Sequence, residues 1–296
     1  MKDHSIIFKI KRKLLHWVCP ILPDEIYLRW LFRLKMGYKL NLKAPRTYNE
    51  KLQWLKLNDI HPEYAKLVDK IDAKNFAEQK IGAKYIIPTI GTWDNVNDIE
   101  WENLPEKFVI KCTNDSGGIV VCKDKSRLDI NRVKAKLEDG WRKNYYQRNK
   151  EYPYRDLKPR IIAEEYMEDE SGYELKDYKF FCFDGEPKFL FVATGRQQND
   201  TRFDFFDLEW NHLPVLNGHP NADHPIPVPK NFLEMVEVAH KLSQGIPHVR
   251  VDLYNINGNI YFGEMTFFHW SGMTPFEPKE WDYTFGDYLQ LPKTKE

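Results

Sequence analysis

The sequence predicts an α+β fold whose sheets are mainly antiparallel. Two pairs of β-prone runs are each joined by a short turn: residues 249–256 and 259–266 across Asn257-Gly258, and residues 174–183 and 187–194 across Asp184-Gly185. Strands joined by such turns run antiparallel. Because these hairpins outnumber β-α-β units, we expect an α+β architecture.

Composition narrows the class of protein. A chain of 296 residues with 42% hydrophobic and 15% aromatic residues suits one large or two modest packed domains. Its formal net charge of +0 argues against a broadly basic nucleic-acid binder. The four cysteines are scattered without a Cys-x-x-Cys pair, which is typical of reduced thiols in a cytosolic protein.

Nothing in the sequence predicts export or a membrane span. The N-terminus lacks an apolar core followed by a small-residue cleavage site, and no run approaches ~18 apolar residues, so we expect a cytoplasmic protein. Residues 6–34, however, mix basic side chains with aromatic and aliphatic ones. This mixture fits an amphipathic helix packed on its own domain. It also fits a peripheral contact with the anionic inner face of a membrane.

Helical patterns fill residues 1–60, where Thr47 and Glu50 form a capping box. Residues 61–82 are expected to form one further helix. The remaining elements are expected as strands at 84–88, 108–112, 119–122, 160–167 and 203–208, a helix from Asp129 to about 148, a proline-rich loop at 214–229 and a helix at 231–244.

The last hairpin carries two acids whose relation depends on register. A three-residue loop sets Asp252 opposite Glu264 and Arg250 opposite Thr266, whereas a two-residue loop puts the acids on opposite faces. Facing carboxylates at about 5 Å would repel by roughly 3–4 kcal/mol unless a positive group lay between them. Arg250 and Mg²⁺ are both candidates. The alternative is a hairpin edge with a surface Arg–Asp pair.

Lys111 lies in an otherwise apolar strand, just before the loop that contains Ser116, Gly117 and Gly118. Glycines let backbone N–H groups approach an anion closely, and a nearby lysine neutralises its charge. The loop is therefore typical of a phosphate cradle, although its spacing is not that of a Walker A loop. An ordinary hairpin turn with an outward-facing lysine is the alternative.

Two further stretches carry candidate polar groups. Residues 164–169 end a strand with acids, and such a strand end can offer backbone groups to an adenine edge and a carboxylate to ribose hydroxyls, or can be a solvated acidic turn. Lys179 shares a strand face with Asp177 and Phe181, so it projects beside an apolar pocket. Arg196 and Arg202 flank a polar loop and fit either anion recognition or an ordinary surface.

Taken in chain order, these sequence motifs resemble those of the ATP-grasp superfamily. The chain looks closest to the TupA-like ATP-grasp family, which is associated with teichuronopeptide and polysaccharide synthesis. The resemblance covers roughly residues 25–285. It is carried jointly by residues 47–54, 69–70, 108–111, 177–180, 206–207, 250–254 and 261–267.

The resemblance implies an ATP-grasp domain over residues 61–296, preceded by the helical segment 1–60. Its two α+β lobes would be a small lobe at about 105–160 and a large lobe at about 165–290, with ATP between them. Residues 269–272 follow where related ligases place a substrate loop.

The resemblance also implies roles for individual residues. Lys70 and Lys111 would contact the phosphates or adenine of ATP, and Ser116, Gly117 and Gly118 would close over its β- and γ-phosphates. Adenine and ribose would be held by Glu165, Tyr166, Met167 and Glu168 or Asp169. Asp252 and Glu264 would hold Mg²⁺, and Arg250 and Lys179 would be catalytic. Thr266 stands where the superfamily usually has asparagine, so the second metal site has a hydroxyl in place of an amide.

By this resemblance the chain would be an ATP- and Mg²⁺-dependent ligase that joins a small-molecule or glycan carboxylate to an amine through an acyl phosphate, in cell-surface polymer synthesis. One alternative is a glycosyltransferase-type polysaccharide enzyme, which needs a nucleotide-sugar site and a metal-binding Asp-x-Asp loop that we do not find. The other is a nucleotide-binding scaffold without catalysis. The sequence makes no prediction about oligomeric state.

Overall fold

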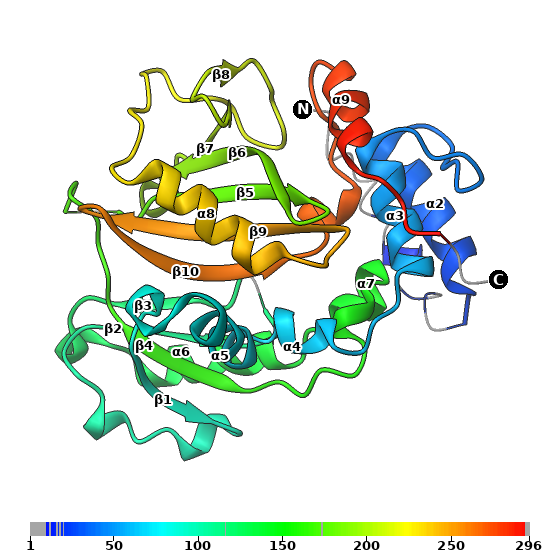
Figure 1. The fold of residues 1–296 in the computed structure, drawn as a ribbon. Helices are drawn as coiled ribbons and strands as arrows, with labels where there is room; N and C mark the ends of the chain where they lie inside the picture. Colours follow the sequence, from blue (N-terminus) through cyan, green and yellow to red (C-terminus); the bar gives the residue numbers. More distant parts are fainter. Residues whose placement is uncertain are drawn as a thin grey trace.

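The computed structural model describes residues 10, 11, 13–15, 17, 19, 21–115, 117–172 and 174–293, with the side chain of Gln197 excepted. Two antiparallel sheets form separate layers, with the N-terminal helices and the C-terminal helix beside them (Figure 1). The prediction of an α+β fold with mainly antiparallel sheets is therefore confirmed. Within the described residues, no helix is both long and apolar enough to cross a bilayer.

The N-terminal part is helical, as α2 (Asp24–Met36), α3 (Tyr48–Asn58), α4 (Tyr64–Val68) and α5 (Lys70–Ile81). The predicted capping box is present: Thr47 Oγ1 accepts from the Glu50 backbone N–H, and the Glu50 carboxylate accepts from the Thr47 N–H, each at 3.2 Å. The prediction of a single helix at 61–82 is wrong. Asp69 breaks it, because its extended backbone caps α5 and its side chain accepts from Ile71 and Asp72.

A four-stranded sheet has the order β1-β4-β2-β3. Its strands are β1 (Thr89–Trp93), β2 (Phe108–Cys112), β3 (Val120–Cys122) and β4 (Ile161–Glu165). The prediction of a strand at 84–88 is wrong, because Ala83–Tyr85 is a 3₁₀ turn, η1, and β1 begins only after Pro88. Proline has no N–H for a ladder, and the Pro88 carbonyl instead accepts from Glu165 N at 3.1 Å.

Helix α6 (Ile130–Trp141) lies against β2. The helix expected from Asp129 to about 148 begins correctly, because the Asp129 side chain accepts from Arg132 N. It ends early, however, and Asn144 caps a separate short helix, α7 (Tyr145–Asn149). Further 3₁₀ turns are η2 (Val96–Asp98), η3 (Trp101–Asn103), η4 (Lys125–Arg127), η5 (Tyr152–Tyr154), η6 (Arg196–Gln198) and η7 (His269–Gly272).

The larger sheet has six strands in the order β10-β9-β5-β6-β7-β8. They are β5 (Asp177–Phe183), β6 (Glu186–Thr194), β7 (Arg202–Asp207), β8 (His212–Leu213), β9 (His248–Ile256) and β10 (Asn259–Thr266). Helix α8 (Phe232–Ser243) contacts β5, β6 and β9 across one face (Figure 1).

The other face of the large sheet is divided into an apolar half and a charged half. At the apolar half, Phe189 stacks on Phe285 of α9 (Glu280–Tyr288) with ring centroids 3.8 Å apart, and Tyr48 of α3 packs edge-on to Phe181. Because side chains alternate along a strand, Asp177 and Lys179 share this face with Phe181 but lie beyond the aromatic packing. The charged half is where the candidate site lies.

Candidate active site

The last hairpin brings Asp252 and Glu264 together by a route that differs from both loop lengths considered for the sequence. The turn has two residues, Asn257 and Gly258, with φ angles of 55° and 92°, and Ile256 pairs with Asn259. That register alone would separate the acids. One extra residue in β10 between Phe262 and Glu264 shifts the pairing, so Asp252 lies opposite Glu264 and Arg250 opposite Thr266.

The extra residue is Gly263, and the space around it explains why it is glycine. A Cβ at this position would lie 3.0 Å from the Asp252 carbonyl oxygen and 3.2 Å from the ring of Tyr254. Glycine inside a strand often marks a bulge or a close backbone approach, and here it marks both. The bulge therefore places the two acids on one face.

Asp252 is fully buried between two cations. Arg250 donates from Nε to Oδ1 at 2.7 Å and from Nη2 to Oδ2 at 2.8 Å, and Lys179 Nζ also pairs with Oδ2. Burial raises the pKa of Asp252, and Arg250 and Lys179 oppose that rise. Arg250 Nη2 also donates to Thr266 Oγ1 at 3.0 Å, so all four residues belong to one cluster.

Glu264 is the more open acid, with its side chain 36% exposed. Its Oε1 lies 3.6 Å from Arg250 Nη2 and accepts from Thr266 Oγ1 at 3.4 Å. Burial alone would raise the pKa of Glu264, but Lys70, Lys179, Arg250 and Lys111 together lower it to about 2. Glu264 is therefore an anion at neutral pH with oxygen lone pairs directed into a cationic environment.

The donor set at this cluster fits Mg²⁺ on a polyphosphate. Mg²⁺ takes one or two carboxylates and completes its shell with phosphate and water oxygens, and Asp252, Glu264 and the Thr266 hydroxyl supply oxygens of that kind. Within the described ranges, no group of three or more His, Cys, Asp or Glu side chains could hold a metal by itself. Asp252 must also share its oxygens with Arg250 and Lys179, so Glu264 is the readier ligand.

The small sheet contributes a second buried cluster. Glu164 on β4 pairs with Lys74 at 2.8 Å and with Lys111 at 2.5 Å. Burial would raise the pKa of Glu164, but the two ammonium groups lower it to about 2. The acid that joins the lysines is thus Glu164, whereas the neighbouring Glu165 is exposed. The sequence analysis missed Lys74, although it lies one helical turn after Lys70 and so shares its face of α5.

Lys70 holds the glycine-containing loop. Its Nζ donates to the carbonyl of Asp115 at 2.8 Å and to that of Thr113 at 3.4 Å. The Asp115 carboxylate in turn accepts from Lys143 and from the Tyr145 hydroxyl, each at 2.9 Å. This packing explains the last glycine of the loop, since a Cβ on Gly118 would lie 2.7 Å from Asp115 Oδ2.

In the same loop, Gly117 N donates to Asp115 Oδ1 at 3.1 Å, and Gly117 is exposed. The third predicted residue of the loop, Ser116, lies outside the described residues.

The strand end after β4 directly follows Glu164 of the second cluster. Tyr166 donates from its hydroxyl to Glu168 at 2.8 Å, and its ring lies under Lys123 at 5.4 Å. Glu168 is exposed and Met167 half-buried. Asp169 accepts from Lys176 at 2.7 Å and so supports the following turn.

Two buried residues, His269 and Asp177, contact the central arginine and lysine, a role that the sequence analysis did not predict for them. His269 accepts at Nδ1 from Arg250 Nη1 at 2.6 Å, and its Nε2 lies 2.8 Å from Asn217 Oδ1. Because a guanidinium only donates and Oδ1 only accepts, the proton lies on Nε2. Burial and the nearby Arg250 keep the pKa of His269 far below its usual value, so the ring is neutral. Asp177 pairs with Arg196 and lies 3.5 Å from Lys179.

Direct contacts thus join Lys179, Arg250, Asp252, Glu264 and Thr266 in one cluster, and the charges of Lys70 and Lys111 help to lower the pKa of Glu264. The profile of the family described as TupA-like ATPgrasp matches residues 50–290 of the sequence. The chain belongs to the TupA-like ATP-grasp family. The resemblance inferred from the sequence motifs is confirmed, and with it the ATP-grasp fold.

Solved structures of other ATP-grasp proteins are similar at low identity. The D-alanine–D-alanine ligase from Bacillus anthracis complexed with ATP is 14% identical with a TM-score of 0.39, over 68% of this chain and 53% of that one. VanG D-Ala:D-Ser ligase from Enterococcus faecalis is 14% identical with a TM-score of 0.41, over 75% and 60%.

The ATP-grasp ligase PsnB, complexed with minimal precursor, Mg and ADP, is 10% identical with a TM-score of 0.39, over 74% of this chain and 57% of that one. This TupA-like chain therefore spans less than two thirds of the length of each of these three proteins. A comparison with curated proteins found no match.

Proposed function

We propose that the chain is an ATP- and Mg²⁺-dependent carboxylate–amine ligase. One observation carries the proposal: Asp252 and Glu264 lie opposite each other on one sheet face, within a group formed by Lys70, Lys111, Lys179 and Arg250. Such a group neutralises a polyphosphate and leaves oxygens for its metal. Nothing in the proposed chemistry needs a protein nucleophile.

The proposed reaction has two displacements. A carboxylate oxygen of the first substrate attacks the γ-phosphorus of ATP, ADP leaves, and an acyl phosphate forms. The amine of the second substrate then attacks the acyl carbon, phosphate leaves, and the amine proton passes to solvent or phosphate. When bound, Mg²⁺ would neutralise charge on the phosphates.

Each protein group has a definable part in this scheme. Lys179 and Arg250 would face the transferred phosphoryl group, and their ion pairs with Asp252 hold them in place beforehand. Neutral His269 orients Arg250 without adding a positive charge. Asp252, Glu264 and Thr266 would hold the metal, and Lys70, Lys111, Ser116, Gly117 and Gly118 would surround the phosphates.

The adenine and ribose contacts are proposed at the strand end after β4. Backbone groups of Glu165, Tyr166 and Met167 would meet the adenine edge, and the exposed Glu168 carboxylate can reach ribose hydroxyls. Residues 61–296 would form the catalytic domain, with the helical segment 1–60 placed before it.

For substrates we propose an acidic sugar, a uronate or a peptide as the carboxylate and an amino compound as the amine, in cell-surface polysaccharide or teichuronopeptide synthesis. The support is the membership of the TupA-like family. The test is an ADP-release screen that pairs amino acids with uronic acids and acidic peptides. Release that requires both a carboxylate and an amine supports the ligase, whereas ATP binding without release in any mixture supports a scaffold.

A further inference from the structure

The N-terminal part of the molecule exposes more apolar surface than its own packing uses. We call this set of exposed side chains the N-terminal apolar surface: Ile10, Leu14, Trp17, Ile21, Ile26 and Trp30. Trp17 is 81% exposed and Trp30 57% exposed. Single exposed apolar residues are normal on proteins, but six large ones between residues 10 and 30 point to an interaction site.

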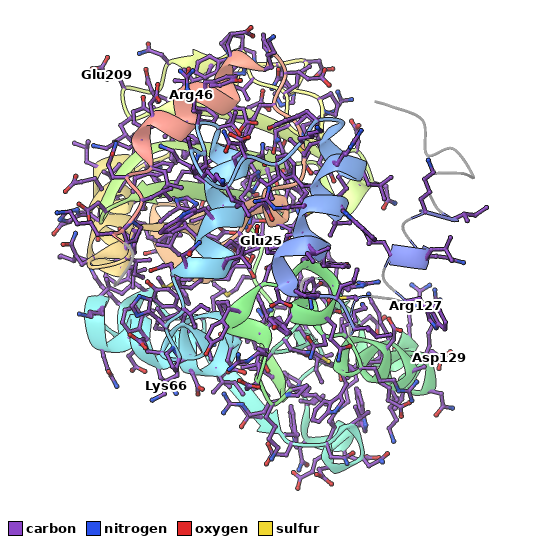
Figure 2. All side chains as sticks on the ribbon, turned by 90° about the vertical axis from the view of Figure 1, so that its right-hand side faces the viewer. Glu25, Arg46, Lys66, Arg127, Asp129 and Glu209 are labelled. Carbon is purple, nitrogen blue, oxygen red and sulfur yellow. The ribbon has the colours of Figure 1, made fainter. Side chains whose placement is uncertain are left out.

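The spacing of these residues is helical. Residues 10, 14 and 17 recur at intervals of four and three, and the residues described between 10 and 17 are in helical conformation, whereas Ile21 lies in a turn. Ile26 and Trp30 are one turn apart on α2, and Arg33 follows on the same side. Both helical segments therefore expose apolar side chains on one face. Figure 2 shows α2 facing the viewer and the described part of the preceding segment at the margin of the molecule.

Packing within the protein involves only the side of these helices opposite to the N-terminal apolar surface. Tyr27, Leu28, Leu31 and Phe32 of α2 are buried, and a core cluster joins them to Leu15, Cys19, Leu40 and Met273. The Tyr27 hydroxyl donates to the Arg148 carbonyl at 2.7 Å and fixes α2 against the end of α7. An amphipathic helix packed on its own domain explains these residues and leaves the exposed face unexplained.

The charge around the exposed face is positive. Its two acids are already paired, Asp24 with Lys150 and Glu25 with Arg29, each at 2.8 Å. Lys11, Lys13 and Arg33 are exposed beside the apolar residues. Basic side chains flanking tryptophan and aliphatic residues are typical of helices that lie in the interface of an anionic bilayer, where tryptophan is favoured at headgroup depth.

We propose that the N-terminal apolar surface docks on an anionic lipid bilayer, with Trp17 and Trp30 entering the headgroup region and Lys11, Lys13 and Arg33 facing the lipid charges. This goes beyond the proposed reaction and does not depend on it. A second copy of the chain is the competing occupant. It would have to accept the same positive charge on both sides of a symmetric contact, which is unfavourable.

Vesicle co-sedimentation of the full chain tests the proposal. We expect pelleting with mixed phosphatidylglycerol–phosphatidylcholine vesicles, little pelleting with pure phosphatidylcholine, and weaker binding at raised salt. Trp17→Ser with Trp30→Ser should lower the partition coefficient by at least about tenfold, since exposed side chains lose apolar contact with lipid. Lys11→Glu, Lys13→Glu and Arg33→Glu together should lower it by about a hundredfold.

Matched controls keep the result interpretable. Leu233→Ser with Val228→Ser removes exposed apolar residues elsewhere, and Lys66→Glu, Lys188→Glu and Lys230→Glu make the same charge change on other surfaces. Both controls should pellet like the wild type. The proposal is overturned if the wild type stays in solution with anionic vesicles, if the tryptophan variant binds unchanged, or if both charge variants lose binding equally. A Trp-dependent dimer without vesicle binding would assign the surface to a second copy instead.

Discussion

The two acids of the proposed metal site, Asp252 and Glu264, are not equivalent, although they face each other. Asp252 is fully buried and is held by Arg250 and Lys179, so replacing it leaves buried cations without their partner. Such losses typically cost about 3–5 kcal/mol. Glu264 is partly exposed and makes long contacts, so its replacement changes the chemistry with less effect on folding. Glu264 is therefore the better residue for testing function.

We predict that Glu264→Gln lowers ADP release by at least about a hundredfold, because it removes a ligand charge where phosphate charge is transferred. Its free energy of unfolding at pH 7 should fall by less than about 3 kcal/mol, because the lowered pKa of Glu264 sets that upper limit and solvent screens its 36% exposed side chain. Coupled-assay kinetics and urea denaturation measure the two effects. Turnover near the wild-type rate would remove Glu264 from the metal site.

Glu164 gives a prediction about pH. The pKa of Glu164 is about 2 in the folded protein and 4.5 without its partners, so its ionisation stabilises the fold above about pH 4.5. That stabilisation, about 3 kcal/mol, is lost as the pH falls from about 4.5 to about 2. Glu164→Gln should therefore be less stable than wild type at pH 7, with a difference that shrinks over this window.

Urea denaturation at several pH values measures this difference, and Glu165→Gln is the matched control, since Glu165 is the exposed neighbour. We expect the control to follow the wild type throughout. A Glu164→Gln difference that stays constant with pH would contradict the assigned ion pairs.

At the scale of elements, the β9–β10 hairpin shows what a sequence can and cannot predict. The Asn257-Gly258 pair predicts a tight turn, and the structure has one with both φ angles positive. Turn chemistry alone, however, gives the register that separates Asp252 from Glu264. The glycine at 263 is the sequence feature that could have indicated the bulge, which brings Glu264 opposite Asp252. Whether a glycine inside a strand forms a bulge depends, however, on the neighbouring strand, which the local sequence pattern does not specify.

Gly263→Val should therefore lower activity sharply while the hairpin persists. If position 263 paired with Asp252 in a regular ladder, Glu264 and Thr266 would turn to the opposite sheet face. Gly263→Ala is milder: its Cβ would lie 3.0 Å from the Asp252 carbonyl oxygen, and we expect a loss of about 1–3 kcal/mol. ADP release and thermal denaturation measure both. Full activity of the Gly263→Val variant would show that the bulge does not set the site.

The turn η7 carries His269 to Arg250 and is held from α3. Trp270, Ser271 and Gly272 have φ angles of 47°, 59° and 60°. Consecutive left-handed residues persist only when their surroundings hold them. Lys56 does so, because its Nζ donates to the Ser271 carbonyl and hydroxyl, each at 2.9 Å, and burial lowers the pKa of Lys56 to about 7.

Lys56→Met should cost about 2–3 kcal/mol, because it leaves buried acceptors unsatisfied, and should also lower kcat about tenfold through misplaced His269 and Arg250. Lys51→Met is the control on the same helix. Lys51 donates to the carbonyls of Gly286 and Leu289, each at 2.8 Å, away from η7. We expect the control to lose stability and keep kcat. Equal kcat values in the two variants would exclude a positioning role for Lys56.

At the scale of the whole molecule, the site is assembled from segments far apart in the chain. Glu164 meets Lys74 across 90 residues, and Lys179 meets Asp252 across 73. The strands and helices that carry these residues were largely predictable from local patterns and caps. Which side chains pair was not, because pairing depends on how α5 and the two sheets pack. The family resemblance predicted which residues form the site. The structure added Lys74 and showed that Asp177 contacts Lys179 and that His269 contacts Arg250.

A ligand that contacts both sheets should stabilise the whole chain. At about 100 times its Kd, Mg²⁺–ATP should add about 2.7 kcal/mol and raise the Tm by several degrees. A UDP-sugar should give no shift. Differential scanning fluorimetry distinguishes the two, and a shift with UDP-sugar alone would favour the glycosyltransferase alternative.

The most direct test of the central claim is the Mg²⁺ dependence of nucleotide binding, measured by titration calorimetry with a non-hydrolysable ATP analogue. Wild type should bind the analogue at least about tenfold more tightly with Mg²⁺ than with EDTA, and this ratio should fall close to one in Glu264→Gln. An equal Mg²⁺ dependence in both proteins, or no binding to wild type, would contradict a metal–nucleotide site between the two sheets.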